Sequence, residues 1–132
     1  MVCLAAVLAL TGCTQTNEDL IVGEWTMDRV TLTVMENGHT SVSELPGYDD
    51  YKMDFVKEGY CNVVVRGVAT VYTWYLVDDN TLLLSLDGKA EDYIIDELTK
   101  KRLVYSDTYS VRDSVTNVSD FYTHTFELSK HK

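Results

Sequence analysis

Proline, cysteine and basic side chains are all scarce in this sequence. The 132 residues contain one Pro and three Cys, and 11 Lys and Arg stand against 21 Asp and Glu, for a formal net charge of −10. Such an excess of negative charge argues against nucleic acid as a partner, because phosphate binding needs clustered Lys and Arg. The one proline, Pro46, falls between expected strands and leaves their hydrogen-bond ladders unbroken.

The chain is rich in residues that favour β-strands. Val, Ile and Thr make up about a quarter of it, and nine Tyr, three Phe and two Trp add a large aromatic content. β-Branched and aromatic residues favour strands over helices. The length suits one domain with a real hydrophobic core and is too short for two.

The N-terminal segment MVCLAAVLALTGC carries no charge and contains an apolar run at residues 2–10. At about 1.5 Å per helical residue this run cannot cross a hydrocarbon core roughly 30 Å thick, whereas its length suits the core of a signal peptide. Its end, Leu10-Thr11-Gly12-Cys13, resembles the cleavage box of bacterial lipoproteins, in which the Cys is lipidated before cleavage ahead of it. The other interpretation is a buried N-terminal strand or helix with an incidental Cys.

The lipoprotein resemblance divides the chain into three parts. Residues 1–12 are the signal peptide, residues 13–19 a lipidated tether, and residues 20–132 a folded domain held at a membrane by acyl chains on Cys13. No Asp follows Cys13, which by the sorting rules of such lipoproteins favours the outer membrane. Glu18-Asp19 also resembles an acidic pair used for surface export. We therefore expect a lipid-anchored protein of the cell envelope, on its periplasmic or outer side.

From residue 20 onward, short segments of alternating apolar and polar residues are separated by turn signals. Asn37-Gly38 supplies the positive φ angles of a tight hairpin, and Gly59 marks another. The pattern predicts nine strands, at residues 27–34, 40–45, 51–56, 60–66, 70–77, 81–86, 91–98, 102–109 and 120–128. Residues 110–119 are expected to form a polar loop.

Consecutive hairpins predict antiparallel neighbours in up-and-down order. A meander of eight or nine such strands can close into an all-β barrel, which removes the exposed edges that invite aggregation. An eight-stranded barrel is either filled by side chains or holds one small ligand. A two-sheet β-sandwich is the alternative fold.

Three motifs resemble the lipocalin-like domains of bacterial lipoproteins. Gly23-Glu24-Trp25 is similar to the Gly-x-Trp opening of lipocalins, residues 95–103 to a hairpin with Ile-x-x-Leu-Thr and then Leu, and Trp74 precedes a Leu-rich strand. The resemblance implies a calycin-type barrel with one open mouth and the other end closed by packing at Gly23 and Trp25. Lipocalins commonly place an Arg of the last strand over that Trp. Here the last strand has no Arg and only Lys130 lies just beyond it, a departure from true lipocalins.

No constellation of residues predicts catalysis or a metal centre. His39, His124 and His131 lack metal-ligand spacing, and the acidic pairs fall at expected turns. Neither a Gly-x-Ser-x-Gly elbow nor a phosphate-binding Gly loop is present. Cys61, the lone thiol of the expected mature chain, cannot form an internal disulfide and suits a small buried position. We expect neither enzymatic activity nor a cofactor.

The aromatic and thioether side chains leave two interpretations. They form a packed barrel core, or they line a cavity for a small hydrophobic or amphipathic ligand, with Arg66 or Tyr hydroxyls as its polar groups. On the second interpretation, which we expect, the ligand-binding residues are Met53, Arg66, Tyr72, Trp74 and Tyr105. The alternative function is an interaction or inhibitor module that presents its barrel surface and the loops at residues 45–50 and 110–119 to another envelope protein.

Overall fold

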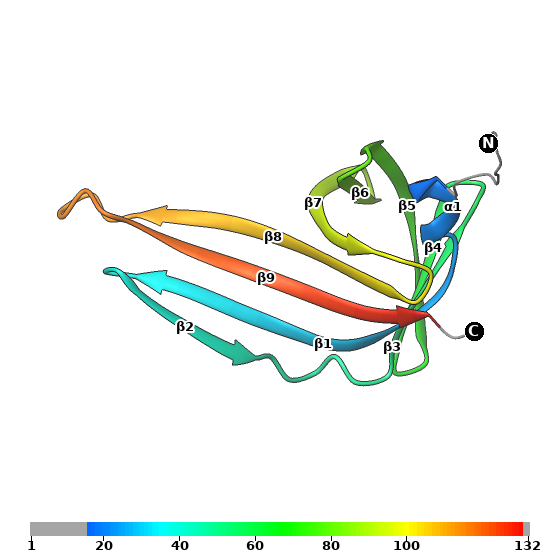
Figure 1. Ribbon diagram of the computed structural model, residues 1–132, viewed down its shortest axis with the longest axis horizontal. Helices are drawn as coiled ribbons and strands as arrows, with labels where there is room; N and C mark the ends of the chain where they lie inside the picture. Colours follow the sequence, from blue (N-terminus) through cyan, green and yellow to red (C-terminus); the bar gives the residue numbers. More distant parts are fainter. Residues whose placement is uncertain (1–15, 131–132) are drawn as a thin grey trace, which may run out of the picture.

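The computed structural model describes residues 16–130, which form one short helix and nine antiparallel strands (Figure 1). The elements are α1 (Asn17–Ile21), β1 (Gly23–Glu36), β2 (His39–Glu44), β3 (Tyr51–Val56), β4 (Tyr60–Val65), β5 (Val68–Asp78), β6 (Thr81–Leu86), β7 (Lys89–Leu98), β8 (Arg102–Arg112) and β9 (Ser119–Lys130). The expected signal peptide, Cys13 and His131 lie outside the described residues.

The pairing of β1 with β9 closes the sheet into an eight-stranded barrel. The strand order is β2-β1-β3-β4-β5-β6-β7-β8-β9, and β9 returns to β1 along a register that runs from Trp25 opposite Lys130 to Met35 opposite Phe121. The predicted all-β, up-and-down barrel is confirmed, with β2 as one extra strand beside it, and the β-sandwich alternative is wrong. This architecture is compatible with a calycin-like fold.

Several boundaries differ from the sequence-based prediction, and the largest differences are at the start of β1 and around residues 110–119. β1 begins at Gly23 instead of residue 27, and Asn17, expected in a tether, begins the helix α1. The predicted loop at residues 110–119 is also wrong at both ends, because β8 continues to Arg112 and β9 already begins at Ser119. Ser110 and Ser119 sit on the paired ladder, and only residues 113–118 form the connection.

Three barrel strands continue past the barrel and, together with β2, form a projecting sheet, which we call the arm. It consists of residues 31–36 of β1, 39–44 of β2, 106–112 of β8 and 119–125 of β9. Figure 1 shows these strands running side by side away from β3–β7 and α1, along the long axis of the molecule. The arm exists because β1, β8 and β9 are longer than their neighbours β3 and β7, which pair only with their barrel ends.

α1 covers the end of the barrel at which β1 begins. The side chain of Thr16 accepts a hydrogen bond from the Asp19 amide (3.1 Å), a standard N-cap for so short a helix. Ile21 is fully buried, and its carbonyl accepts a hydrogen bond from the Trp25 indole N–H at 2.8 Å. The helix therefore joins the core at Trp25 and closes this end by packing.

Lys130 completes the closed end. Its Nζ lies 5.0 Å from the centre of the Trp25 ring and donates hydrogen bonds to the carbonyls of Leu20 and Val22, both at 2.8 Å. Gly23, with φ +131°, leaves room for the lysine side chain, because a Cβ at this position would lie 2.9 Å from Lys130 Cε. The cation that the lipocalin resemblance expects over this Trp is thus supplied by Lys130.

We expect Lys130→Met to destabilise the domain by about 2 kcal/mol, because two partly buried carbonyls lose a charged donor and the Trp25 ring loses its cation. Urea unfolding followed by Trp fluorescence measures the change. Lys101→Met is the control, since Lys101 is exposed in the turn before β8 and should leave the midpoint unchanged. Equal midpoints for the two variants would contradict a stabilising role for Lys130.

Candidate functional site

The barrel interior is filled by side chains. Of the five residues predicted to bind a ligand, Met53 (1 % exposed), Tyr105 (3 %) and Trp74 (6 %) belong to the packed core. The Tyr105 hydroxyl donates to Met53 Sδ at 3.4 Å, and the Trp74 indole N–H donates to the Val56 carbonyl at 2.8 Å. The polar atoms of these three side chains already have hydrogen-bond partners, in one another or in the backbone. All three side chains lie below the surface that a ligand could reach.

Tyr72 alone of the five lines a cavity. This cavity of about 230 Å³ is half open, and it lies at the end of the barrel opposite α1. Its lining is apolar at Tyr72 of β5 and at Leu84 and Leu86 of β6. It is charged at the exposed Lys89 and Glu91 of β7, which lie opposite Leu86 and Leu84 at the rim. Tyr93 of β7 completes the lining, and its hydroxyl donates to Glu91 Oε1 at 3.4 Å.

Tyrosine hydroxyls gather beside this mouth and remain protonated. Burial, aided by the nearby Tyr72 and Tyr48, raises the pKa of Tyr51 to about 12. Burial also raises the pKa of Tyr93, with further contributions from Glu91 and Asp107. A neutral phenol both donates and accepts hydrogen bonds, so the mouth offers polar groups that carry no charge.

Arg66 lies at the same end of the molecule but is occupied by the backbone. It adopts a φ of +48° in the turn between β4 and β5, and its Nη2 donates to the Gly47 carbonyl at 2.9 Å. It therefore fastens the 45–50 loop and does not line the mouth cavity. That loop borders a second, more polar cavity of about 160 Å³ that also includes Asp28 and Arg29.

A row of aromatic rings leads from the barrel interior onto the arm. The Tyr105 and Phe126 rings stack with centres 4.9 Å apart, and the Tyr109 and Tyr122 rings stack at 5.0 Å. His124 lies between these two pairs, 6.4 Å from Phe126 and 6.2 Å from Tyr109. Cross-strand ring pairs of this kind stabilise the β8–β9 ladder where no barrel core supports it.

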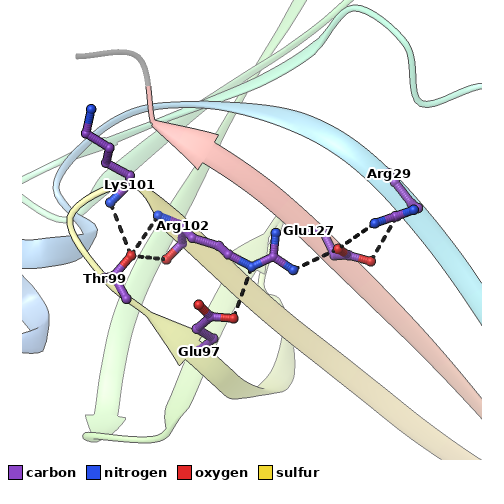
Figure 2. Close-up of polar contacts among 6 residues, drawn as sticks. All are labelled: Arg29, Glu97, Thr99, Lys101, Arg102 and Glu127. Atoms are coloured by element: carbon purple, nitrogen blue, oxygen red, sulfur yellow. Dashed lines mark hydrogen bonds and ion pairs between the residues drawn. The ribbon is translucent and has the colours of Figure 1, made fainter.

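The outer face of the barrel carries a row of alternating charges (Figure 2). Arg29 of β1 contacts Glu127 of β9 at 3.1 Å, Glu127 contacts Arg102 of β8 at 2.9 Å, and Arg102 contacts Glu97 of β7 at 3.0 Å. Hydrogen bonds from the two arginines hold the pKa of the Glu127 carboxyl below its usual range. The row ties four neighbouring strands of the barrel together, from β1 to β7.

Reactive side chains within residues 16–130 are few. Burial raises the pKa of the Cys61 thiol to about 12, so the thiol stays protonated and is a poor nucleophile. His124 Nδ1 lies 3.3 Å from Asp107 Oδ1 on the arm, whereas His39 is exposed on β2. Among these residues no group of three His, Cys, Asp or Glu could hold a metal ion, and no helix is long and apolar enough to cross a membrane.

Sequence reasoning missed the rim of the mouth and the contact of Lys130. Lys89 and Glu91 alternate with Tyr93 on one strand, and this period-two spacing was the available signal that all three share a face. For Lys130 the signal was its position two residues after Leu128, which put it on the interior face of β9. Neither signal identifies a partner, because the partners come from β6 and from the start of the domain.

Models of known protein families give no match to the chain, and neither do curated protein sequences. The fold is established by the strand order and the closing β1–β9 pairing.

Proposed function

We propose that this chain is a non-catalytic binding module of the cell envelope. Its ligand is a small hydrophobic or amphipathic molecule that enters the mouth of the barrel. The half-open cavity beside Tyr72, Leu86 and Tyr93 is the observation that carries this proposal, because its lining combines apolar side chains with a few polar ones. Acyl chains on Cys13 hold the module at the membrane.

The size of the cavity limits the ligand. A cavity of about 150 Å³ in a protein core is known to accept benzene, so about 230 Å³ suits a molecule or a chain end of one to two rings. The filled interior behind Trp74 and Tyr105 stops such a ligand at the mouth. Lys89 and Glu91 place one positive and one negative charge at the rim, so ligands with an anionic and with a cationic head group are both tested below.

The closed end supports the lipocalin-like part of the proposal. Gly23 and Trp25 open the first strand, a cation stacks over the indole ring, and α1 covers this end. One closed end leaves the opposite end as the entrance. The lipid anchor is supported by the sequence alone, through Leu10-Thr11-Gly12-Cys13 at the end of the apolar segment.

A second candidate function is interaction with another envelope protein. The arm favours it, because the connection at residues 113–118 and the hairpin at residues 37–38 are carried to its far end (Figure 1). Exposed apolar side chains gather on it, namely Met35, Val42, Tyr109, Val111, Val115, Val118 and Phe121. Apolar surface of this kind is typical of interaction sites.

Binding at the mouth is tested with two fluorescent naphthalene amphiphiles, one with a sulfonate and one with an amine. We expect at least one of them to bind. Leu86→Arg should weaken its binding about tenfold, because the arginine side chain occupies the cavity and places a charge in its apolar lining. Leu83→Arg is the matched control, since Leu83 alternates to the outer face of β6. No binding by the wild-type protein, or equal losses in both variants, would reject the mouth as the site.

The anchor is tested by feeding a Gram-negative expression host with labelled palmitate. The full chain should take up the label and fractionate with membranes, and Cys13→Ala should do neither. Cys3→Ala is the control and should behave as the wild type, because residue 3 lies in the expected signal peptide. Palmitate uptake that survives Cys13→Ala would overturn the anchor.

A further inference from the structure

The far half of β8 is an open sheet edge. β7 pairs with β8 only from Leu103 to Ser106, and a bulge between Ile95 and Glu97 turns β7 away there. From residue 107 to Arg112, β8 is paired with β9 on one side and, among the described residues, with nothing on the other. In Figure 1 β8 continues along the arm after β7 has left it.

The hydrogen-bond pattern shows which groups of this edge are free. Lys130 N–H bonds to the Lys101 carbonyl and Asp113 N–H to the Val118 carbonyl, both at 3.0 Å, at the two ends of one register. Antiparallel pairing alternates, so the odd-numbered residues of β8 direct their N–H and C=O groups toward β9. The even-numbered residues direct theirs the other way, as the bond from Thr99 N–H to the Arg102 carbonyl shows at the barrel end.

Thr108, Ser110 and Arg112 therefore present their backbone N–H and C=O groups to an unoccupied side. Natural edge strands are commonly guarded by lysine, proline or a bulge. The arm strands contain no Lys and no Pro, and the β8–β9 and β1–β2 ladders run without a register shift. An unguarded edge beside exposed Tyr109 and Val111 is suited to receiving a strand.

The charge at this edge selects the kind of strand. Asp107 is one-third exposed, and its buried Oδ1 has no hydrogen-bond partner, although His124 Nδ1 lies 3.3 Å away. The arm also carries Glu36, Glu44 and Asp120, and its one arginine, Arg112, donates to the Asn117 side chain. A cation next to Asp107 would offset the cost of that partly desolvated carboxylate.

We propose that the β8 edge binds an extended segment of a partner protein by strand addition, with a basic residue facing Asp107 and apolar residues facing Tyr109 and Val111. A second copy of this chain fits less well. Symmetric pairing about Tyr109 would place Asp107 opposite Val111 and leave its charge uncompensated, and it would bring together two chains of net charge −10.

The test uses the isotopically labelled full chain and the capped peptide Thr-Val-Thr-Val-Thr-Lys-Thr, followed by NMR. In antiparallel alignment its Lys faces Asp107 and its two Val face Tyr109 and Val111. We expect the amide signals of Thr108, Ser110 and Arg112 to shift on titration. N-methylation of the two central Thr should weaken binding about tenfold, because those amides face β8, whereas N-methylation of the two Val should not.

Two protein variants and one further peptide complete the design. Ser110→Pro should abolish binding, since it removes an edge N–H that the fold itself does not use, while Val42→Pro at the other open edge, β2, should not. Asp107→Asn, or Glu in place of the peptide's Lys, should weaken binding by about three- to fivefold. Absence of binding, equal loss from both N-methylated peptides, or binding that Ser110→Pro leaves intact would overturn the proposal. Concentration-dependent self-association lost in Ser110→Pro would assign the edge to a second copy instead.

Discussion

The ladder between β1 and β9 is the interaction on which the rest of the molecule depends. At its barrel end it brings Trp25 opposite Lys130, closes the eight-stranded sheet and positions the lysine over the indole ring. At its far end it pairs Met35 with Phe121, well beyond the reach of β3 and β7. The same ladder, with one register shift between Met27 and Arg29, thus builds both the closed barrel and the spine of the arm.

Two consequences follow for binding. Because the barrel is small and its inward side chains are large, the interior fills with Trp25, Phe55, Met53 and Trp74, and the space for a ligand is moved out to the mouth. Because β8 continues along β9 after β7 has diverged, residues 107–112 of β8 form an edge of the arm that has no strand partner among the described residues. The mouth is proposed for a small amphipathic molecule and the β8 edge for an extended polypeptide, so the two proposed sites differ in chemistry and in place.

Much of the architecture could be predicted from local patterns. Alternation of apolar and polar residues located the nine strands, and Asn37-Gly38 located a hairpin, since both signals depend on neighbouring residues only. The register of the closing β1–β9 pairing could not be predicted, because it joins residues about a hundred positions apart. The full length of β8 was missed because Ser110 and Arg112 are polar residues whose strand conformation depends on their pairing with β9. The positions of the predicted ligand-binding residues also depend on the whole barrel. Tyr72 lines a cavity, whereas Met53, Trp74 and Tyr105 are buried in a core whose packing depends on all eight strands together.

Amide hydrogen exchange across β8 and β9 measures this arrangement most directly. If the arm is a paired sheet with one open edge, the amides of Tyr109 and Val111, which face β9, are protected, and those of Thr108 and Ser110 exchange quickly. The β1 amides of Thr31 and Thr33, which face β9, should be protected along with them. Uniformly fast exchange throughout the arm would contradict a continuous β1–β9 ladder, and protection of Thr108 and Ser110 equal to that of Tyr109 would contradict the open edge.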